Sequence, residues 1–464
     1  MCVLADRRSR PDRPQLRQRV DPTRKVAWEV MRAVEEQDAY VNLLLPALLR
    51  ENGIAGRDAA FTTELTHGTI RRSRTYDAVL DTLAPKGIDA PVRDVLRLGT
   101  HQILAMRVPS HAAVSTSVDL TRAVIGHRPA SFVNAVLRKV AASDLPTWLE
   151  RVAPSYEDDP VGHLAVVHAH PRWIVEALRD AVGAPAAEGE LAALLEADNA
   201  APQVTLVARP GLADADDLAG LSGSPGEWSP YAFRLEGGDP GAIEGVREGR
   251  IGVQDEGSQL VAIAAAAVPV AGPDARWLDL CAGPGGKAAL LGALGAARGA
   301  ELVANEVTPH RAELVRSAVR LLDNTEVVVH DGRTLEADAP YDRVVVDAPC
   351  TGLGALRRRP EARWRRQPSD LVGLVPLQRD LLAHALDLVR VGGVVTYATC
   401  SPHLAETRGV VEAMLGARDD VELVDVTSVL PEVPYLDRSA PYVQLWPHLH
   451  GTDAMFVAAL RRTA

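Results

Sequence analysis

The sequence has few cysteines, few aromatic residues and no long hydrophobic run. Only four of its 464 residues are cysteine, and aromatic residues make up 4% of the chain. No apolar stretch approaches the roughly 18 residues that a membrane-spanning helix requires, and the first ten residues lack the apolar core of a signal peptide. We therefore expect a cytoplasmic protein that makes no membrane contact.

The four cysteines also lack the spacing of a zinc site. They lie at positions 2, 281, 350 and 400, so no pair forms a CxxC motif. Structural disulfides are rare in cytoplasmic proteins. The sequence therefore indicates neither a metal site nor a disulfide framework, and each thiol needs its own explanation. Cys2 lies in a polar, arginine-rich tail and is assigned no role.

Basic residues are concentrated in two places although the net charge is −11. The first cluster, within residues 7–25, is interpreted as a solvated tail. The second follows Cys350 directly and includes Trp364. Planar guanidinium groups beside an aromatic ring suit phosphates and unstacked bases, so the second cluster is predicted to bind RNA. Its members are Arg357, Arg358, Arg359, Arg363, Arg365 and Arg366.

The length exceeds what one hydrophobic core usually serves, so several domains are expected. We predict a disordered basic tail over residues 1–20 and an all-α domain over residues 21–145, where apolar residues recur at helical spacing. A small α+β linker domain follows over residues 146–250. The remaining residues, 251–464, are predicted to form an α/β domain.

Strands and helices alternate in this last region. That alternation predicts a mostly parallel sheet covered by helices, whose ligands bind at the carboxyl ends of the strands. The strands are expected at residues 276–280, 301–306, 326–330, 343–347, 394–398, 421–426 and 454–460.

A glycine-rich turn follows the first of these strands, and acids follow the next three. Glycine lets the backbone approach a ligand, and the helix that the turn opens favours anionic groups at its N-terminus. Its spacing is not that of a Walker loop. An acid after the second strand is placed to accept hydrogen bonds from ribose hydroxyls. The predicted ligand-binding residues are Cys281, Ala282, Gly283, Pro284, Gly285, Gly286, Lys287, Glu306, Asp331 and Asp347.

Cys350 and Cys400 each follow a hydrophobic strand, so the predicted sheet brings two thiols to its binding edge. A thiolate adds readily to an electron-poor carbon such as C6 of a pyrimidine. This addition makes C5 nucleophilic enough to take a methyl group from a sulfonium donor. Asp347 is placed to stabilise charge that develops near N3. Free cysteine otherwise packs as a small hydrophobe, and Cys281 keeps that structural interpretation, with only its backbone near the ligand.

Three motifs then resemble those of the RNA cytosine-C5 methyltransferases of the NOL1/NOP2/Sun group. They are the runs at residues 278–287, 347–352 and 397–401, and the resemblance extends from about residue 165 to the end. It implies a Rossmann-like class I methyltransferase domain with S-adenosyl-L-methionine as cofactor. It also implies that Cys400 is the nucleophile and that Cys350 aids product release.

The helical region resembles a NusB-type RNA-binding domain, through residues 109–114 and 132–138. Members of the group that carry this fusion methylate a cytosine in 16S ribosomal RNA, so the resemblance implies that RNA as partner; we also expect a monomer. Gly283 departs from the family pattern, which has alanine there. The arginine-rich tail is not covered by the resemblance.

Other interpretations remain open. An exocyclic-amine methyltransferase uses a similar sheet, but its Asn/Asp-Pro-Pro-aromatic motif does not fit Asp347-Ala348-Pro349-Cys350. Another RNA, such as tRNA, could be the substrate. The two thiols could exchange roles, as in DNA cytosine-C5 methyltransferases, which use the Pro-Cys thiol as nucleophile. A noncatalytic RNA-binding factor would explain the helical domain but not the two thiols with the strand-end acids.

Overall fold

The computed structural model describes residues 20–183 and 187–464, so Cys2 and the predicted tail before residue 20 lie outside the described residues. The chain divides into two compact units. The first contains the described residues up to 39 together with residues 43–69 and 76–148, and the second contains residues 40–42, 70–75 and 149–464. Each unit is described separately below.

The first unit is all helical, as predicted. The first helix shows why this sequence forms helices. The Asp21 carboxylate accepts a hydrogen bond from the Thr23 amide at 2.9 Å, which caps the N-terminus of the helix. Val26, Val30 and Met31 then recur on one buried face. The helices are α1 (Pro22–Glu36), α2 (Val41–Glu51), α3 (Gly56–Arg71), α4 (Ser73–Leu83), α5 (Ala90–Leu104), α6 (Ser110–Val124) and α7 (Ala130–Val140). α8 (Leu145–Val152) follows at the boundary between the units.

The second unit contains a small antiparallel sheet with the strand order β2-β3-β1-β4. Its strands are β1 (Thr205–Ala208), β2 (Gly223–Pro225), β3 (Ala232–Leu235) and β4 (Ile251–Val253). The predicted domain boundary at residue 250 falls inside this sheet, because β4 pairs with β1. The helices in this part of the second unit are α9 (Pro160–Val167), α10 (Arg172–Val182), α11 (Ala187–Ala197), α12 (Ala215–Leu218) and α13 (Glu244–Glu248).

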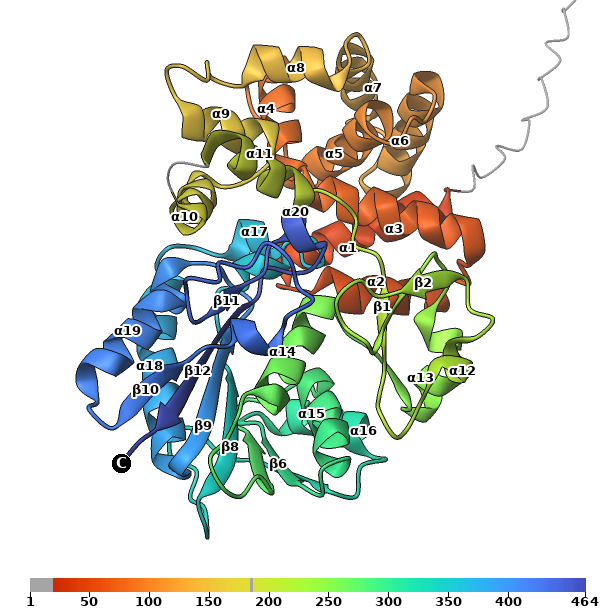
Figure 1. The fold of residues 1–464 in the computed structure, drawn as a ribbon. Coiled ribbons are helices and arrows are strands. Elements are labelled where there is room, and N and C mark those ends of the chain that lie inside the picture. The colour runs from red at the N-terminus through yellow and green to blue at the C-terminus, as the bar shows by residue number, and fades with distance from the viewer. Residues whose placement is uncertain (1–19, 184–186) are drawn as a thin grey trace, which may run out of the picture. The chain divides into compact units, whose positions relative to one another are not determined.

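The larger sheet of the second unit has the strand order β10-β12-β9-β8-β5-β6-β7 (Figure 1). β5 to β9 are parallel, and β12 runs antiparallel between β9 and β10. The predicted α/β class is therefore confirmed. The strands are β5 (Arg276–Asp279), β6 (Glu301–Asn305), β7 (Thr325–Val328), β8 (Tyr341–Asp347), β9 (Val389–Thr399), β10 (Val421–Val424), β11 (Val443–Gln444) and β12 (Phe456–Arg462).

Helices pack against this sheet and bury its apolar side chains. One core joins Leu278, Val344 and Val395 of three neighbouring strands to Leu382 and Leu386 of a long helix. The helices are α14 (Glu256–Ala267), α15 (Gly286–Ala296), α16 (Pro309–Val319), α17 (Ala362–Arg365), α18 (Asp370–Leu388), α19 (Arg408–Ala417) and α20 (Pro447–His450). Among the described residues, no helix is long and apolar enough to cross a bilayer.

Asn305 ties together the ends of three parallel strands. Its side-chain amide donates to the carbonyls of Leu280 and His330 at 3.0 and 3.1 Å, and its side-chain oxygen accepts the His330 amide at 3.0 Å. The side chain is buried. The loops that follow β5, β6 and β7 are therefore fixed relative to one another by one residue.

We expect Asn305→Ala to lower the free energy of unfolding by about 2–3 kcal/mol, because it leaves buried backbone groups without partners. Urea denaturation followed by tryptophan fluorescence would measure this change. Glu313→Ala on the exposed face of α16 is the control and should change stability by less than about 0.5 kcal/mol. Equal effects of the two substitutions would contradict this role of Asn305.

Candidate active site

Two thiols meet at the carboxyl edge of the larger sheet. Cys400 directly follows β9, and Cys350 lies three residues after β8. The two sulfur atoms are 3.4 Å apart, within hydrogen-bonding distance for a thiol and a thiolate. The parallel pairing of Asp347 with Ala398 brings these segments together across 50 residues of sequence. The predicted juxtaposition of both cysteines at one edge is thus present in the structure.

The surroundings distinguish the two sulfur atoms. The pKa of the Cys400 thiol is lowered because Cys350 hydrogen-bonds to it, and the cations Lys287 and Arg359 act in the same direction against burial. The pKa of Cys350 is raised well above its ordinary value by that same hydrogen bond, by burial and by nearby negative charge. A thiolate is the reactive form of cysteine. The surroundings therefore favour a negative charge on Cys400 over one on Cys350.

The glycine-rich turn lies between β5 and α15. Gly285 has φ +109°, a conformation that side-chain-bearing residues rarely adopt, and a Cβ there would lie 2.7 Å from the Ala318 Cβ. At the end of the turn, Lys287 Nζ lies 2.9 Å from the Asp347 carboxylate. Burial lowers the pKa of Lys287, but the charge and hydrogen bond of Asp347, together with the charges of Cys400 and Asp279, raise it overall. Lys287 is therefore a retained cation beside Asp347, and it lowers the pKa of Cys400.

Two buried carboxylates lie at the strand ends beside this turn. Asp279 accepts the Cys281 amide at 3.4 Å through one oxygen, while its other oxygen has no hydrogen-bond partner among the described residues. Burial and the neighbouring Asp347 raise the pKa of Asp279 to about 7. Glu306 accepts the Thr308 amide at 2.9 Å. Both groups retain acceptor capacity for a ligand with ammonium or hydroxyl donors.

The other predicted ligand residues have different surroundings. The Cys281 side chain is inert, because burial and nearby acids raise its pKa well above the usual range. Asp331 is bound by Arg333, whose hydrogen bonds lower the pKa of Asp331 to about 2. A Cβ at Gly283 would lie only 2.0 Å from the outer carboxylate oxygen of Glu306. The family's alanine would therefore require Glu306 to adopt another rotamer.

The arginine-rich segment after Cys350 only partly faces solvent. Arg363 is fully buried and donates to the carbonyl of Ala169 at 2.9 Å and to the side-chain oxygen of Asn199 at 2.8 Å. Arg357 is also buried and lies 3.6 Å from both Asp255 and Asp453. These two arginines stabilise the fold, which corrects the prediction that they contact RNA.

The remaining arginines of this segment stay accessible. Arg359 is exposed, and the side chains of Arg358, Arg365 and Arg366 are partly exposed. Arg358 donates to Asp453 at 2.9 Å, and Arg366 lies 3.5 Å from Asp370. Arg359 is the member whose charge lowers the pKa of Cys400. The predicted RNA contacts are therefore limited to these four arginines.

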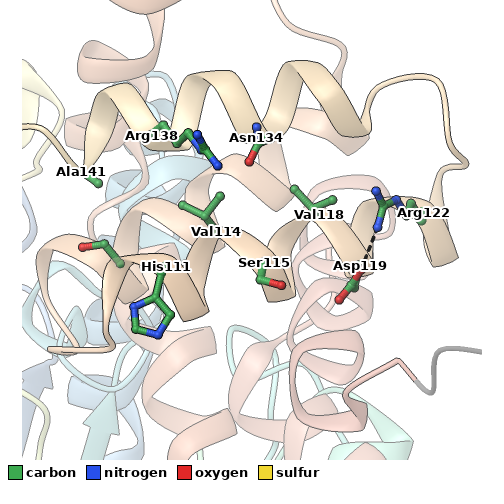
Figure 2. Close-up of a pocket in the computed structure, with 10 residues that line it drawn as sticks. His111, Val114, Ser115, Val118, Asp119, Arg122, Asn134, Arg138 and Ala141 are labelled. Atoms are coloured by element: carbon green, nitrogen blue, oxygen red, sulfur yellow. Dashed lines mark hydrogen bonds and ion pairs between the residues drawn. The ribbon is translucent and has the colours of Figure 1, made fainter.

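The first unit has a surface hollow of about 610 Å³ between α6 and α7 (Figure 2). Residues 105–143 around it contain five basic residues and one acidic residue, whereas the whole chain has a net charge of −11. The lining residues are Ser110, His111, Val114, Ser115, Val118, Asp119, Arg122, Asn134, Arg138 and Ala141. Asn134 and Arg138 of α7 point toward Val114 and Val118 of α6 (Figure 2). The hollow thus combines a valine floor with polar and basic walls.

Sequence reasoning missed Asp279 as a site residue, and it missed Glu406 and Gln378, which are buried next to the Cys350 loop. Asp279 lies within a recognised motif and could have been included on that ground. Glu406 is an acid six residues after Cys400, but its burial cannot be inferred from that spacing. Gln378 lies on α18 and gives no local signal. Among residues 20–183 and 187–464, no group of three candidate metal ligands occurs.

Comparison with known proteins identifies the family. The family model "16S rRNA methyltransferase RsmB/F" matches residues 269–461, and the NusB family model matches residues 21–142. The chain is 54% identical to Rv1407 of Mycobacterium tuberculosis over 450 residues, covering 96% of this chain and 98% of that protein. This chain belongs to the RsmB/F methyltransferase family. The predicted NOL1/NOP2/Sun resemblance and the NusB-type domain are confirmed.

Another member of the RsmB/F family has a more specific name. The chain is 30% identical to Ribosomal RNA small subunit methyltransferase B of Pseudomonas syringae, covering 95% of this chain and 97% of that protein. Among solved structures, PH0851 aligns with a TM-score of 0.76 at 21% identity, covering 96% of this chain and 99% of that one. NSun6 of Pyrococcus horikoshii aligns with a TM-score of 0.53 at 16% identity, covering 64% of this chain and 100% of that one. These two structures support the fold.

The cofactor of this class I methyltransferase is S-adenosyl-L-methionine, as predicted. The residues at the sheet edge fit it chemically. The unpartnered oxygen of Asp279 suits the ammonium group, and the buried carboxylate of Glu306 suits ribose hydroxyls. When bound, the cofactor supplies an electrophilic methyl group. The glycines in the turn at residues 281–287 carry no side chain, so a ligand can approach the backbone there closely.

We expect Cys350→Ala to shift the pH profile for alkylation of Cys400 to higher pH, because the substitution removes the hydrogen bond that stabilises the Cys400 thiolate. Iodoacetamide labelling followed by mass spectrometry of the Cys400 peptide would measure the profile. Cys281→Ala is the matched control and should leave it unchanged. An unchanged profile in Cys350→Ala would show that the thiol contact does not activate Cys400.

Proposed function

We propose that this protein transfers a methyl group from S-adenosyl-L-methionine to C5 of a cytosine in 16S ribosomal RNA through a covalent adduct between Cys400 and C6. The observation that carries this proposal is the pair of thiols 3.4 Å apart at the cofactor-binding edge. An exocyclic-amine methyltransferase needs no such pair. Family membership supports ribosomal RNA of the small subunit as the substrate.

The adduct accounts for the residues at the site. The Cys400 thiolate forms a bond to C6, and the electron pair of the C5–C6 double bond becomes available at C5. Bound S-adenosyl-L-methionine would supply the methyl group to C5, and its methyl–sulfur bond would break to leave a neutral thioether. A base then removes the C5 proton, the double bond re-forms, and Cys400 leaves as a thiolate. Lys287 and Asp347, 2.9 Å apart, form a polar pair that can stabilise charge on the pyrimidine ring.

The assignment of the two thiols follows from their surroundings. Cys400 has the lowered pKa and starts the reaction, whereas Cys350 has the raised pKa and acts while the adduct is resolved. The reverse assignment would require the thiol that keeps its proton to attack first. The target base must also leave its stack, which favours a cytosine in an unpaired region.

The hollow between α6 and α7 is proposed as an RNA-docking surface of the NusB-type unit. Arg122 and Arg138 line it, and Lys139 lies on the exposed surface of α7. Basic side chains on a chain that is acidic overall indicate a local site for phosphates. Polar groups of Ser110, Ser115 and Asn134 add hydrogen-bonding capacity.

The decisive experiment uses cysteine variants with tritiated S-adenosyl-L-methionine and unmodified 16S RNA. Cys400→Ala should abolish both methyl transfer and covalent protein–RNA complexes on a denaturing gel. Cys350→Ala should let those complexes accumulate, because the nucleophile remains while its release is impaired. Accumulation in Cys400→Ala instead would reverse the thiol assignment. Methylation of tRNA but not of 16S RNA by the wild-type protein would contradict the proposed substrate.

Charge reversal in the hollow tests the docking surface. Arg138→Glu should weaken binding of a 16S RNA fragment about tenfold at 0.1 M salt and reduce the slope of log affinity against log salt by about 1–2. Lys86→Glu is the matched reversal at an exposed position elsewhere in the same unit. Fluorescence anisotropy would measure both variants. Equal weakening by Lys86→Glu would indicate a general charge effect and would exclude a docking role for the hollow.

A further inference from the structure

A buried carboxylate lies directly behind the thiol pair. Glu406 ends the short helix η3 (Leu404–Glu406), and its side chain is inaccessible to solvent. One oxygen accepts the Thr351 amide at 2.8 Å and the Gln378 side-chain amide at 3.0 Å, and the other accepts the Thr351 hydroxyl at 2.5 Å. All of these donors are neutral, and no lysine, arginine or histidine of the described chain pairs with Glu406.

These hydrogen bonds hold both sides of Cys350. Thr351, the following residue, donates twice to Glu406, and the Gln378 amide that reaches Glu406 also reaches the carbonyl of Pro349, the preceding residue, at 2.8 Å. The peptide segment that carries the Cys350 thiol is therefore fixed at both ends by one carboxylate and one amide.

The same network extends to the segment that carries Cys400. The Thr351 hydroxyl lies 3.0 Å from the hydroxyl of Ser401, the residue after Cys400. The Gly354 amide donates to the carbonyl of Cys400 at 2.8 Å. Thr351 and Ser401 are both buried. The distance between the two sulfur atoms is thus set by a buried network centred on Glu406.

The charge of Glu406 also acts on the two thiols unequally. The pKa of Cys350 is raised most by the hydrogen bond to Cys400 and by burial, and the negative charge of Glu406 raises it further. The charges that act most strongly on Cys400 are different: Asp347 raises its pKa, and the cations Lys287 and Arg359 lower it. Glu406 and Asp347 thus favour a proton on Cys350, whereas the hydrogen bond from Cys350 and the two cations favour a negative charge on Cys400 despite burial and Asp347.

We propose that Glu406 is a positioning residue that fixes Cys350 against Cys400 and keeps the proton of the pair on Cys350. The inference rests on the proposed function and deepens it, because it accounts for the different roles of two chemically identical side chains. Glu406 touches neither the base nor the cofactor and acts through Cys350. A protonated Cys350 can hydrogen-bond to the Cys400 sulfur as the bond to C6 breaks and Cys400 leaves as a thiolate. Loss of the Glu406 charge therefore slows release of the adduct more than attack by Cys400.

Glu406→Gln tests this inference because it keeps the size of the side chain but removes its charge and turns one acceptor into a donor. The variant should form the covalent RNA complex within about twofold of the wild-type rate and release it about tenfold more slowly. Quenched time courses on a denaturing gel would separate the two rates. Glu412→Gln, at an exposed position on α19, is the matched control and should behave as wild type.

A purely structural role gives a different result. Formation and release of the complex would then fall together, with a lower melting temperature and weaker cofactor binding, and this outcome would overturn the proposal. Combining Glu406→Gln with Cys350→Ala should slow release by less than about twofold beyond Cys350→Ala alone, because both changes remove the same contribution. If Glu406→Gln slowed release another tenfold in the Cys350→Ala background, that result would also overturn the proposal.

A measurement without RNA separates this inference from the proposed function. In a Cys400→Ala background, the alkylation profile of Cys350 should move to lower pH when Glu406→Gln is added, because the anion that raises the pKa of Cys350 is gone. An unmoved or upward profile would overturn the inference even if the methyltransferase proposal holds. A downward shift together with absence of RNA adducts in the wild-type protein would overturn only the proposed function.

Discussion

The active site depends on the parallel pairing of β8 with β9. This pairing places Asp347 opposite Ala398, so the chain segments that leave the two strands emerge side by side. That register brings Cys350 next to Cys400 and joins the two segments in one buried hydrogen-bond network. The pairing of β5 with β8 in turn brings the turn that carries Lys287 to Asp347. A shift of one residue would turn every side chain of a strand to the opposite face of the sheet.

The electrostatics of the site result from partial burial of unlike charges. Lys287 and Arg359 favour negative charge on Cys400, whereas Glu406 and Asp347 oppose it on Cys350. In water these influences would be screened, but the sheet edge removes much of the solvent and strengthens them. Two identical functional groups therefore acquire different proton affinities although they lie at the same sheet edge.

The sequence allowed the sheet and the thiol edge to be predicted because their signals are local. Strands such as Val344–Val346 are continuous apolar runs, and the cysteines and acids follow such runs directly. The burial of Arg363 could not be predicted in this way, because its side chain donates to a carbonyl almost 200 residues away in sequence. Glu406 was missed for the same reason, since its partners come from the Cys350 loop and from α18. The small sheet was predicted only as part of a small α+β domain, because its strands are short and separated by loops.

Gly283 couples the backbone of the glycine-rich turn to two charged side chains. With no side chain there, the outer oxygen of Glu306 occupies the space that a Cβ would fill, and Arg311 bonds the Gly283 carbonyl at 2.7 Å. The exchange of alanine for glycine is therefore linked to the rotamer of an acid that lies 23 positions further along the chain. A side chain at position 283 would have to displace the flexible ends of Glu306 and Arg311 together, so the shape of the glycine-rich turn and the placement of these two charged groups are coupled.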